Sequence, residues 1–428
     1  MPKLFLCVVA YLMVVPLLSL QAGAMALVAL TAAFIFLPAA PGAPDVGYGF
    51  AWPLVPFFLV LLVAVARSPA PQVTTGFLSF HLPGLVLFLI AMRNPRWDPR
   101  LWMVAWSLFS VVMSASVLVA WLRIYFGAEL PLLLEVPEGA LLLSGNTLLN
   151  VPNDICVTAV LLCFPLGLLA PRHVWLPSGG NLAGIPPWSL RALAIVTIFL
   201  AVLAMTILRS RTGFVVAVLE VLVVSAMWRR FILYLLPLAA VLVVADHVFG
   251  VQTLEKLFLS NNMDNHGVSG RLGLWASAWS MFAAAPWFGH GAQSFGPGHG
   301  VYMPDWAPRF PERRVMWAHS LYLETLAEQG VVGLAAFCIL VLPALRGLVI
   351  TLIDSKNVVI LRTVAVVGLA GLAGFLIAAG LELSFIRRWV PLVMFGLLGF
   401  AYRYGVRAPG ASAIPDDQTG NQQPAGLR

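Results

Sequence analysis

The sequence predicts an all-α, polytopic membrane protein, and three observations lead to that class. Of its 428 residues, 61% are hydrophobic and only 10% are charged, whereas charged residues make up roughly 25% of an ordinary soluble domain. Apolar runs long enough to cross a hydrocarbon core of about 30 Å as a helix recur along the whole chain. These runs are apolar on every face, whereas the strands of a membrane barrel would alternate apolar and polar residues.

The apolar runs predict about 12 transmembrane helices. The tenth run is long, and its first part is expected to begin outside the bilayer. The first run also has the features of a signal peptide, but the apolar character resumes at once and a hairpin of two spans explains it equally well. The predicted spans are 4–20, 22–40, 50–66, 76–92, 101–122, 154–170, 190–208, 213–228, 231–249, 318–345, 360–381 and 388–404.

Basic residues near the span ends predict the orientation. Short cytoplasmic connections carry an excess of Lys and Arg, and the connections at 93–100 and 229–230 place this excess on the side of the N-terminus. Both termini are therefore expected in the cytoplasm. Residues 1–408 then form a single transmembrane domain with one long external loop at about 250–317, and 409–428 form a disordered cytoplasmic tail.

Charge and cysteine content exclude two kinds of site. The net charge of +7 is explained largely by this topology, so no nucleic acid partner is expected. Cys7, Cys156, Cys163 and Cys338 fall in apolar spans without metal-ligand spacing, so we expect buried small hydrophobic residues and no disulfide framework. The string GLAGLAGF at 368–375 predicts a small-residue face for close helix packing.

Two arginines stand in a short external hairpin, where the orientation bias disfavours them. Arg209 and Arg211 belong to the string LRSRTG between two apolar runs. Either both snorkel to the interface and contact lipid phosphate without selectivity, or they bind a specific anionic group, since the planar guanidinium suits phosphate oxygens. Both can serve one ligand only if the helix ends near Ser210, because residues two apart in a continuous helix point to nearly opposite faces.

The long external loop is expected to be ordered around an amphipathic helix. In the stretch Ser269–Ala285, Leu272, Trp275 and Trp279 recur at helical spacing and a serine can cap the start. We expect this helix to lie over the membrane face with Arg271 in its first turn. An arginine at that position gains nothing from the helix dipole, so a partner anion is expected.

His319 stands at the head of the next apolar stretch. A histidine there is either a core residue or a group that exchanges a proton, since the unperturbed pKa of imidazole lies near neutrality. The sequence does not identify a residue that assists it. Tyr322, Glu324 and Arg314 are candidates, although Glu324 is expected to lie well off the helical face of the histidine.

Three further histidines of the loop, His266, His290 and His299, could together with His319 suggest a metal site. They have no recognised ligand spacing and stand among glycines. We therefore expect no metal site and no cofactor.

Taken together, these pieces resemble the signature of the O-antigen ligase and polymerase superfamily, whose members are polytopic glycosyltransferases of the bacterial inner membrane. The resemblance covers roughly residues 145–345. It is carried by Pro152–Asn153, Ser210–Arg211, Arg271 followed by Trp275, the turn PWFGHG at 286–291, the Ala318–His319 pair, Glu328–Gly330 and Gly333.

The resemblance implies a donor glycan joined by pyrophosphate to a polyprenyl lipid at the periplasmic face, and an acceptor that is a glycan or the lipid A core. By motif match Arg211 and Arg271 would bind the pyrophosphate, with Arg209 as a further candidate. His319 would accept a proton from the attacking sugar hydroxyl or orient it. Arginines can stabilise the leaving group without a divalent ion, which implies metal-independent transfer with inversion at the anomeric centre.

Two activities share this machinery. A polymerase extends a lipid-linked glycan, and a ligase moves the finished glycan to the lipid A core; the ending at Glu328–Gly333 slightly favours a polymerase. A polysaccharide or lipid transporter is the alternative of another class. The spans are nearly free of charge and the polar groups gather outside, which favours chemistry at the periplasmic face over transport.

Overall fold

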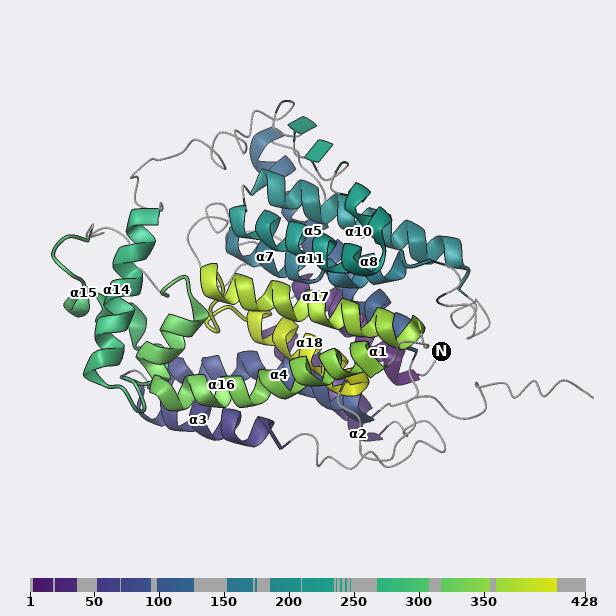
Figure 1. Cartoon of the computed structure of the whole chain (residues 1–428). Coiled ribbons are helices and arrows are strands. Elements are labelled where there is room, and N and C mark those ends of the chain that lie inside the picture. The colour runs from purple at the N-terminus through teal and green to yellow at the C-terminus, as the bar shows by residue number, and fades with distance from the viewer. Residues whose placement is uncertain are drawn as a thin grey trace, which may run out of the picture.

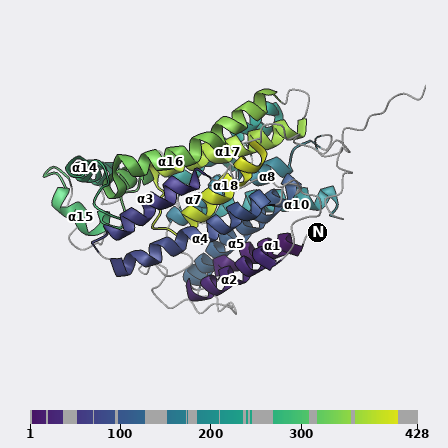
Figure 2. The same cartoon turned by 90° about the horizontal axis from the view of Figure 1, so that it is seen from below.

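The computed structural model is an all-helical bundle (Figure 1). It describes residues 3–17, 20–36, 52–69, 71–93, 98–126, 152–171, 174, 185–208, 210–234, 236, 239–240, 243–244, 247, 268–307, 317–354 and 359–405. The predicted tail, most of the ninth span and the first part of the long loop lie outside these residues. The long helices run side by side along one axis, as the perpendicular view in Figure 2 also shows.

Most of the predicted spans correspond to described helices, the ninth apart, and α14 and α15 belong to the long loop. The helices are α1 (Lys3–Val14), α2 (Leu20–Phe36), α3 (Leu54–Ala66), α4 (Pro71–Arg93), α5 (Pro99–Phe126), α7 (Pro152–Val160), α8 (Cys163–Leu168), α10 (Pro187–Ile207), α11 (Arg211–Met227), α14 (Val268–Ala284), α15 (Phe295–Tyr302), α16 (Leu321–Asp354), α17 (Val359–Leu381) and α18 (Trp389–Gly405). Short 3-10 turns lie at Val15–Leu17 and Arg229–Tyr234.

Length and composition support a polytopic membrane protein. Within the described residues, four helices are long and apolar enough to cross a membrane, namely α5, α10, α16 and α17. Several shorter apolar helices accompany them, including α1 and α3. The orientation relative to the membrane remains a prediction.

The sixth predicted span is broken into α7 and α8. Pro165 has no N–H to donate to the carbonyl of Leu161, so the helical ladder cannot continue there. The Leu161 carbonyl instead accepts the N–H of Phe164, at 3.2 Å. The chain therefore turns at 161–162, a feature that the hydrophobic run alone did not show.

The small-residue face of α17 is confirmed. A Cβ at Gly368 would lie 2.9 Å from Leu348 of α16, and one at Gly371 would lie 2.7 Å from Cys163 of α8. A Cβ at Gly374 would lie 2.6 Å from the carboxylate of Glu220 on α11. Three helices thus approach α17 where a side chain is missing.

Glu220 is an acidic residue within the predicted span 213–228. Its side chain is fully buried in the bundle, and such groups inside membrane helices usually face the bundle interior. The cysteines behave largely as expected, since Cys156 and Cys163 are buried and Cys7 and Cys338 are partly buried, all four unpaired.

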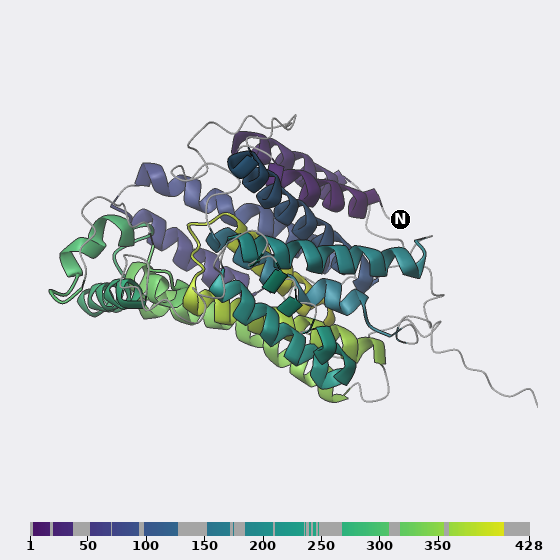
Figure 3. The same ribbon diagram turned by 90° about the horizontal axis from the view of Figure 1, so that it is seen from above.

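The helix predicted in the long loop is α14, and it lies across one end of the bundle. Figure 1 shows it nearly at right angles to the long helices, and Figures 2 and 3 show it end-on beside α15. Leu272 and Trp279 of the predicted apolar stripe are exposed, whereas Leu274, Ala278 and Met281 form a small second core with residues of α15 and α16. The helix therefore packs on protein through these three residues, while Leu272 and Trp279 of the predicted stripe stay exposed.

Candidate active site

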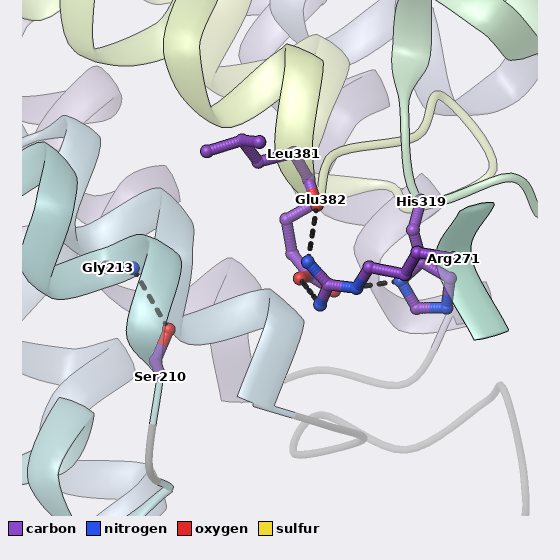
Figure 4. Close-up of polar contacts among 6 residues, drawn as sticks. All are labelled: Ser210, Gly213, Arg271, His319, Leu381 and Glu382. Carbon is purple, nitrogen blue, oxygen red and sulfur yellow. Dashed lines mark hydrogen bonds and ion pairs between the residues drawn. The ribbon is translucent and has the colours of Figure 1, made fainter. Parts of the chain in front are cut away.

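Three chain segments meet at this end of the bundle and bring Arg271, Glu382 and His319 together (Figure 4). Nη2 of Arg271, in the first turn of α14, lies 2.5 Å from Oε2 of Glu382. Nδ1 of His319 lies 3.0 Å from Oε1 of the same carboxylate. Glu382 therefore links the histidine and the arginine that the sequence indicated separately.

Local structure explains why Glu382 is available. Leu381 is the last residue of α17, so its carbonyl has no partner within the helix. Nη1 of Arg271 donates to this carbonyl at 3.0 Å. The guanidinium thus spans the helix end, contacting the backbone of Leu381 and the side chain of Glu382, which fixes its plane.

His319 is held in an unusual backbone conformation just before α16. Its φ of 54° lies in the left-handed region, which is uncommon for a residue with a Cβ and costs on the order of 1–3 kcal/mol. The N–H of the neighbouring Ala318 donates to Glu324 at 3.2 Å. This contact helps to hold the segment in place.

Glu324 also joins this segment to the one that carries Glu382. Its other carboxylate oxygen accepts a hydrogen bond from the hydroxyl of Ser384, and the side chain is buried. Although Glu324 does lie off the histidine, it contacts the backbone on one side of it and the loop that follows α17 on the other. Glu324 therefore supports the site through its neighbours and not by touching the imidazole.

The electrostatics of the site keep Glu382 ionised. Burial alone would raise the pKa of Glu382, but the hydrogen bond from His319 and the charge of Arg271 outweigh it and lower the pKa below its ordinary value. An ionised carboxylate can only accept hydrogen bonds, so Nδ1 of His319 carries a proton. In the neutral imidazole, Nε2 is then the proton acceptor.

Glu382 was missed by the sequence analysis. The partner anion expected for Arg271 is this internal carboxylate. Neither Tyr322 nor Glu324 bonds the imidazole of His319, since the Tyr322 hydroxyl donates to the Leu376 carbonyl at 2.7 Å and Glu324 contacts only neighbouring groups. Arg314 lies outside the described residues. The available signal was an acidic residue directly after an apolar span, at the end predicted to share a side with the long loop.

The LRSRTG hairpin breaks where the sequence required it to break. α10 ends at Ile207, and the hydroxyl of Ser210 caps α11 by accepting the N–H of Gly213 at 3.2 Å (Figure 4). Arg211 is the first residue of α11 and is exposed, whereas Arg209 lies outside the described residues.

Residues 196–338 match a family model described as O-antigen ligase. This part of the chain is similar to the O-antigen ligase and polymerase family. Proteins of this family transfer lipid-linked glycans. The matched range contains Arg211, Arg271 and His319, whereas Glu382 lies beyond it. No curated protein matches the chain.

The family turn PWFGHG interlocks with a break in α16. Gly330 has φ 66° and ψ −165°, and a Cβ there would lie 2.3 Å from the Trp287 carbonyl oxygen. The backbone groups freed by the break pair with the turn: the N–H of Val331 donates to Pro286, and the N–H of Gly291 to Glu328, both at 2.8 Å. These motif residues therefore shape the backbone under the site.

The carboxylate of Glu328 holds the chain just beyond that turn. It accepts the N–H groups of Gln293 at 2.9 Å and Phe295 at 3.0 Å. On the other side, the N–H of Ala292 donates to the Ala64 carbonyl of α3 at 2.8 Å. The first turns of α16 thus carry two buried glutamates, Glu324 and Glu328, that fix the loops around His319.

The described loop histidines use backbone partners. His290 Nε2 lies 2.9 Å from the Met281 carbonyl oxygen, and His299 Nδ1 lies 2.7 Å from that of Gly296. His266 lies outside the described residues. Within the part of the chain that the structure describes, no three His, Cys, Asp or Glu side chains are grouped to hold a metal ion.

Proposed function

We propose that the protein moves a glycan from a polyprenyl pyrophosphate carrier to an acceptor sugar hydroxyl, in O-antigen or exopolysaccharide assembly. The observation that carries this proposal is the contact of His319 with the buried, ionised Glu382 beside Arg271. It leaves Nε2 of the imidazole as a base whose orientation is fixed by its partner. The side chain of His319 is 23% exposed, so a substrate can reach it.

In the proposed step, the acceptor hydroxyl oxygen attacks the anomeric carbon of the donor sugar. The bond from that carbon to the phosphate oxygen breaks, and the hydroxyl proton passes to Nε2 of His319. Glu382 stabilises the resulting imidazolium through Nδ1. Attack opposite the leaving pyrophosphate inverts the anomeric centre.

The leaving group is held by arginines. Arg271 is 32% exposed and its guanidinium plane is already fixed, so it can stabilise growing negative charge without reorganising. Arg211 stands at the N-terminus of α11, where backbone N–H groups and the helix dipole also favour a phosphate. Arg209, beside it in sequence, is the third candidate, and no metal ion or cofactor takes part in the proposed step.

Polymerisation is the first candidate for the overall activity, and ligation to the lipid A core is the second. The motif at Glu328–Gly333, which closes the family resemblance, favours the polymerase. The match to a model described as O-antigen ligase favours the ligase. In either case we place the enzyme in the bacterial inner membrane, with both termini cytoplasmic and the site facing the periplasm.

A reconstituted assay tests the proposal. Purified protein is mixed with polyprenyl pyrophosphate glycan in EDTA, with and without lipid A core, and wild type is compared with His319→Ala and Arg211→Ala. His299→Ala is the matched control, since its ring binds the Gly296 carbonyl. Longer lipid-linked chains without core indicate a polymerase, and product that needs core indicates a ligase.

The proposal predicts that transfer survives in the control, is lost in His319→Ala, and is weakened in Arg211→Ala at low donor concentration. Full activity in His319→Ala and Arg211→Ala would reject the proposed site. A wild-type protein without turnover in either condition would favour the transporter.

A further inference from the structure

The loop that follows α17 brings a second arginine to the neighbourhood of His319. Five residues after Glu382, Arg387 lies with its Cζ 4.4 Å from the centre of the Trp317 ring. The Trp317 and His319 rings are in turn 5.4 Å apart, centroid to centroid. Imidazole, indole and guanidinium therefore form one contiguous row, and the sequence analysis did not single out its last member.

Backbone contacts fix this loop. The N–H of Arg387 donates to the Ser384 carbonyl at 3.1 Å, and the N–H of Ile386 donates to the Ser384 hydroxyl oxygen at 3.2 Å. The same hydroxyl donates to the buried Glu324, which also holds Ala318. The segments that carry Arg387 and Trp317 are thus tied to one carboxylate, so the cation is positioned before any ligand arrives.

Besides the Arg271–Glu382 pair, the neighbourhood of His319 holds a second guanidinium and an indole N–H. Arg271 also pairs with Glu382, which offsets part of its charge toward a pyrophosphate. Arg387 places this guanidinium next to the Trp317 ring, in a half-buried position where Coulomb interactions are stronger than in water. Nε1 of Trp317 is buried and has no hydrogen-bond partner among the described residues, which provides a donor that seeks an acceptor.

We propose that Arg387 and the indole N–H of Trp317 bind a phosphate-type anion of a substrate beside His319. This inference rests on the proposed function. The planar guanidinium fork matches phosphate oxygens, and the aromatic face beneath it holds the fork in one orientation. The anion is either the donor pyrophosphate or a phosphate group on the acceptor, and the two sources predict different kinetic effects.

The test uses Arg387→Ala, Arg387→Lys and Trp317→Phe, with Arg388→Ala as the matched control. Arg388 is the adjacent residue of the same loop, but its guanidinium lies 4.2 Å over Trp389 instead. Both alanine variants remove one positive charge from the same loop. A difference in binding or KM between them therefore arises from the position of Arg387 and not from the loss of charge alone. The purified full-length proteins are compared for binding of inorganic pyrophosphate by calorimetry, for KM of donor and acceptor, and for Tm.

Arg387→Ala is expected to weaken anion binding or raise one KM by about tenfold, the effect of losing one hydrogen bond to a charged group. Arg387→Lys should recover part of the loss, and Trp317→Phe, which keeps the aromatic face, should lose only a few-fold. Weaker pyrophosphate binding with a raised donor KM identifies the donor as the source. A raised acceptor KM alone identifies the acceptor.

The inference is overturned if Arg387→Ala changes binding and both KM values no more than Arg388→Ala does. It is also overturned if Lys is no better than Ala and both variants simply lower Tm. Dependence of pyrophosphate binding on Arg387 in a protein without glycan transfer would leave the anion site standing and reject the proposed function. Glycan transfer by wild type that is unchanged in Arg387→Ala would reject only the anion site.

Discussion

Replacing Glu382 by glutamine isolates the role of its charge. The amide has almost the same size, but it carries no charge and can offer its N–H₂ to Nδ1 of His319, which holds the imidazole in the opposite tautomer. Nε2 then carries the proton and cannot act as a base. Since the wild-type contact is 3.0 Å and the carboxylate is only 6% exposed, water cannot easily replace it.

The expected fall in kcat is about 10²–10⁴-fold, the range for losing an oriented general base. Stability should also fall, because Arg271 loses the carboxylate at 2.5 Å. Removing one partner of a buried ion pair costs about 3–5 kcal/mol. Arg271 is 32% exposed and stays partly solvated, so we expect about 1–3 kcal/mol.

Initial rates of glycan transfer and thermal unfolding should be measured on the same preparations. Glu220→Gln is the matched control, because Glu220 is a buried carboxyl on α11 outside the Arg271–Glu382–His319 group. Its kcat should stay close to that of wild type, because Glu220 has no contact with this group among the described hydrogen bonds and ion pairs of the site. A Glu382→Gln enzyme that also retains its kcat would refute the view that Glu382 orients His319.

Further predictions concern the backbone break, pH, metal ions and the hairpin arginine. Gly330→Ala should destabilise the protein by about 2–4 kcal/mol, since φ is positive and the added Cβ meets the Trp287 carbonyl. The control Gly300→Ala has open space around its Cβ and should change the unfolding free energy by about 0.5 kcal/mol or less. Equal Tm values for the two variants would contradict this prediction. The depressed pKa of Glu382 contributes stability that is present above the ordinary carboxyl pKa of about 4.3 and is lost as the pH falls through the lower pKa of the folded state. On acidification below pH about 4.3, the Tm of wild type should therefore drop more than the Tm of Glu382→Gln. Equal drops in Tm for the two proteins would argue against the ion pair. Transfer rates should be the same in EDTA and in excess Mg²⁺, and a rate abolished by EDTA would mean that arginines alone do not stabilise the leaving group. Arg211→Ala should raise the donor KM by about tenfold, with partial recovery in Arg211→Lys; an unchanged KM would favour the snorkelling interpretation.

Local features were read well from the sequence because hydrophobic length and capping act over a few residues. The break at Ser210 follows from a serine that accepts the N–H three residues on. The helix around Arg271 follows from the spacing, although it begins at Val268, before the serine that was expected to cap it. The turn before Pro165 was missed because the apolar run continues through it. The residues that pack α14 on α15 and α16 were not identified from the sequence, because the helical spacing concerned only Leu272, Trp275 and Trp279.

The partnership at the centre of the site was beyond local patterns. Glu382 contacts His319, 63 residues away in sequence, and Arg271, 111 residues away. A periodic pattern in the sequence does not predict contacts between residues so far apart. Arg271 and His319 were singled out by position and by family resemblance, but the carboxylate that couples them lies outside the family match at 196–338. The stacking of Arg387 on Trp317 depends on tertiary contacts in the same way.

The central claim is that His319 acts as the base in glycan transfer from a polyprenyl pyrophosphate donor. A single-turnover measurement with labelled donor in EDTA tests it most directly, comparing wild type with His319→Ala while inorganic pyrophosphate binding is followed in parallel. The account predicts transfer by wild type, a rate at least about 10²-fold lower in His319→Ala, and pyrophosphate binding retained in both. A His319→Ala protein that transfers the glycan at the wild-type rate would contradict it.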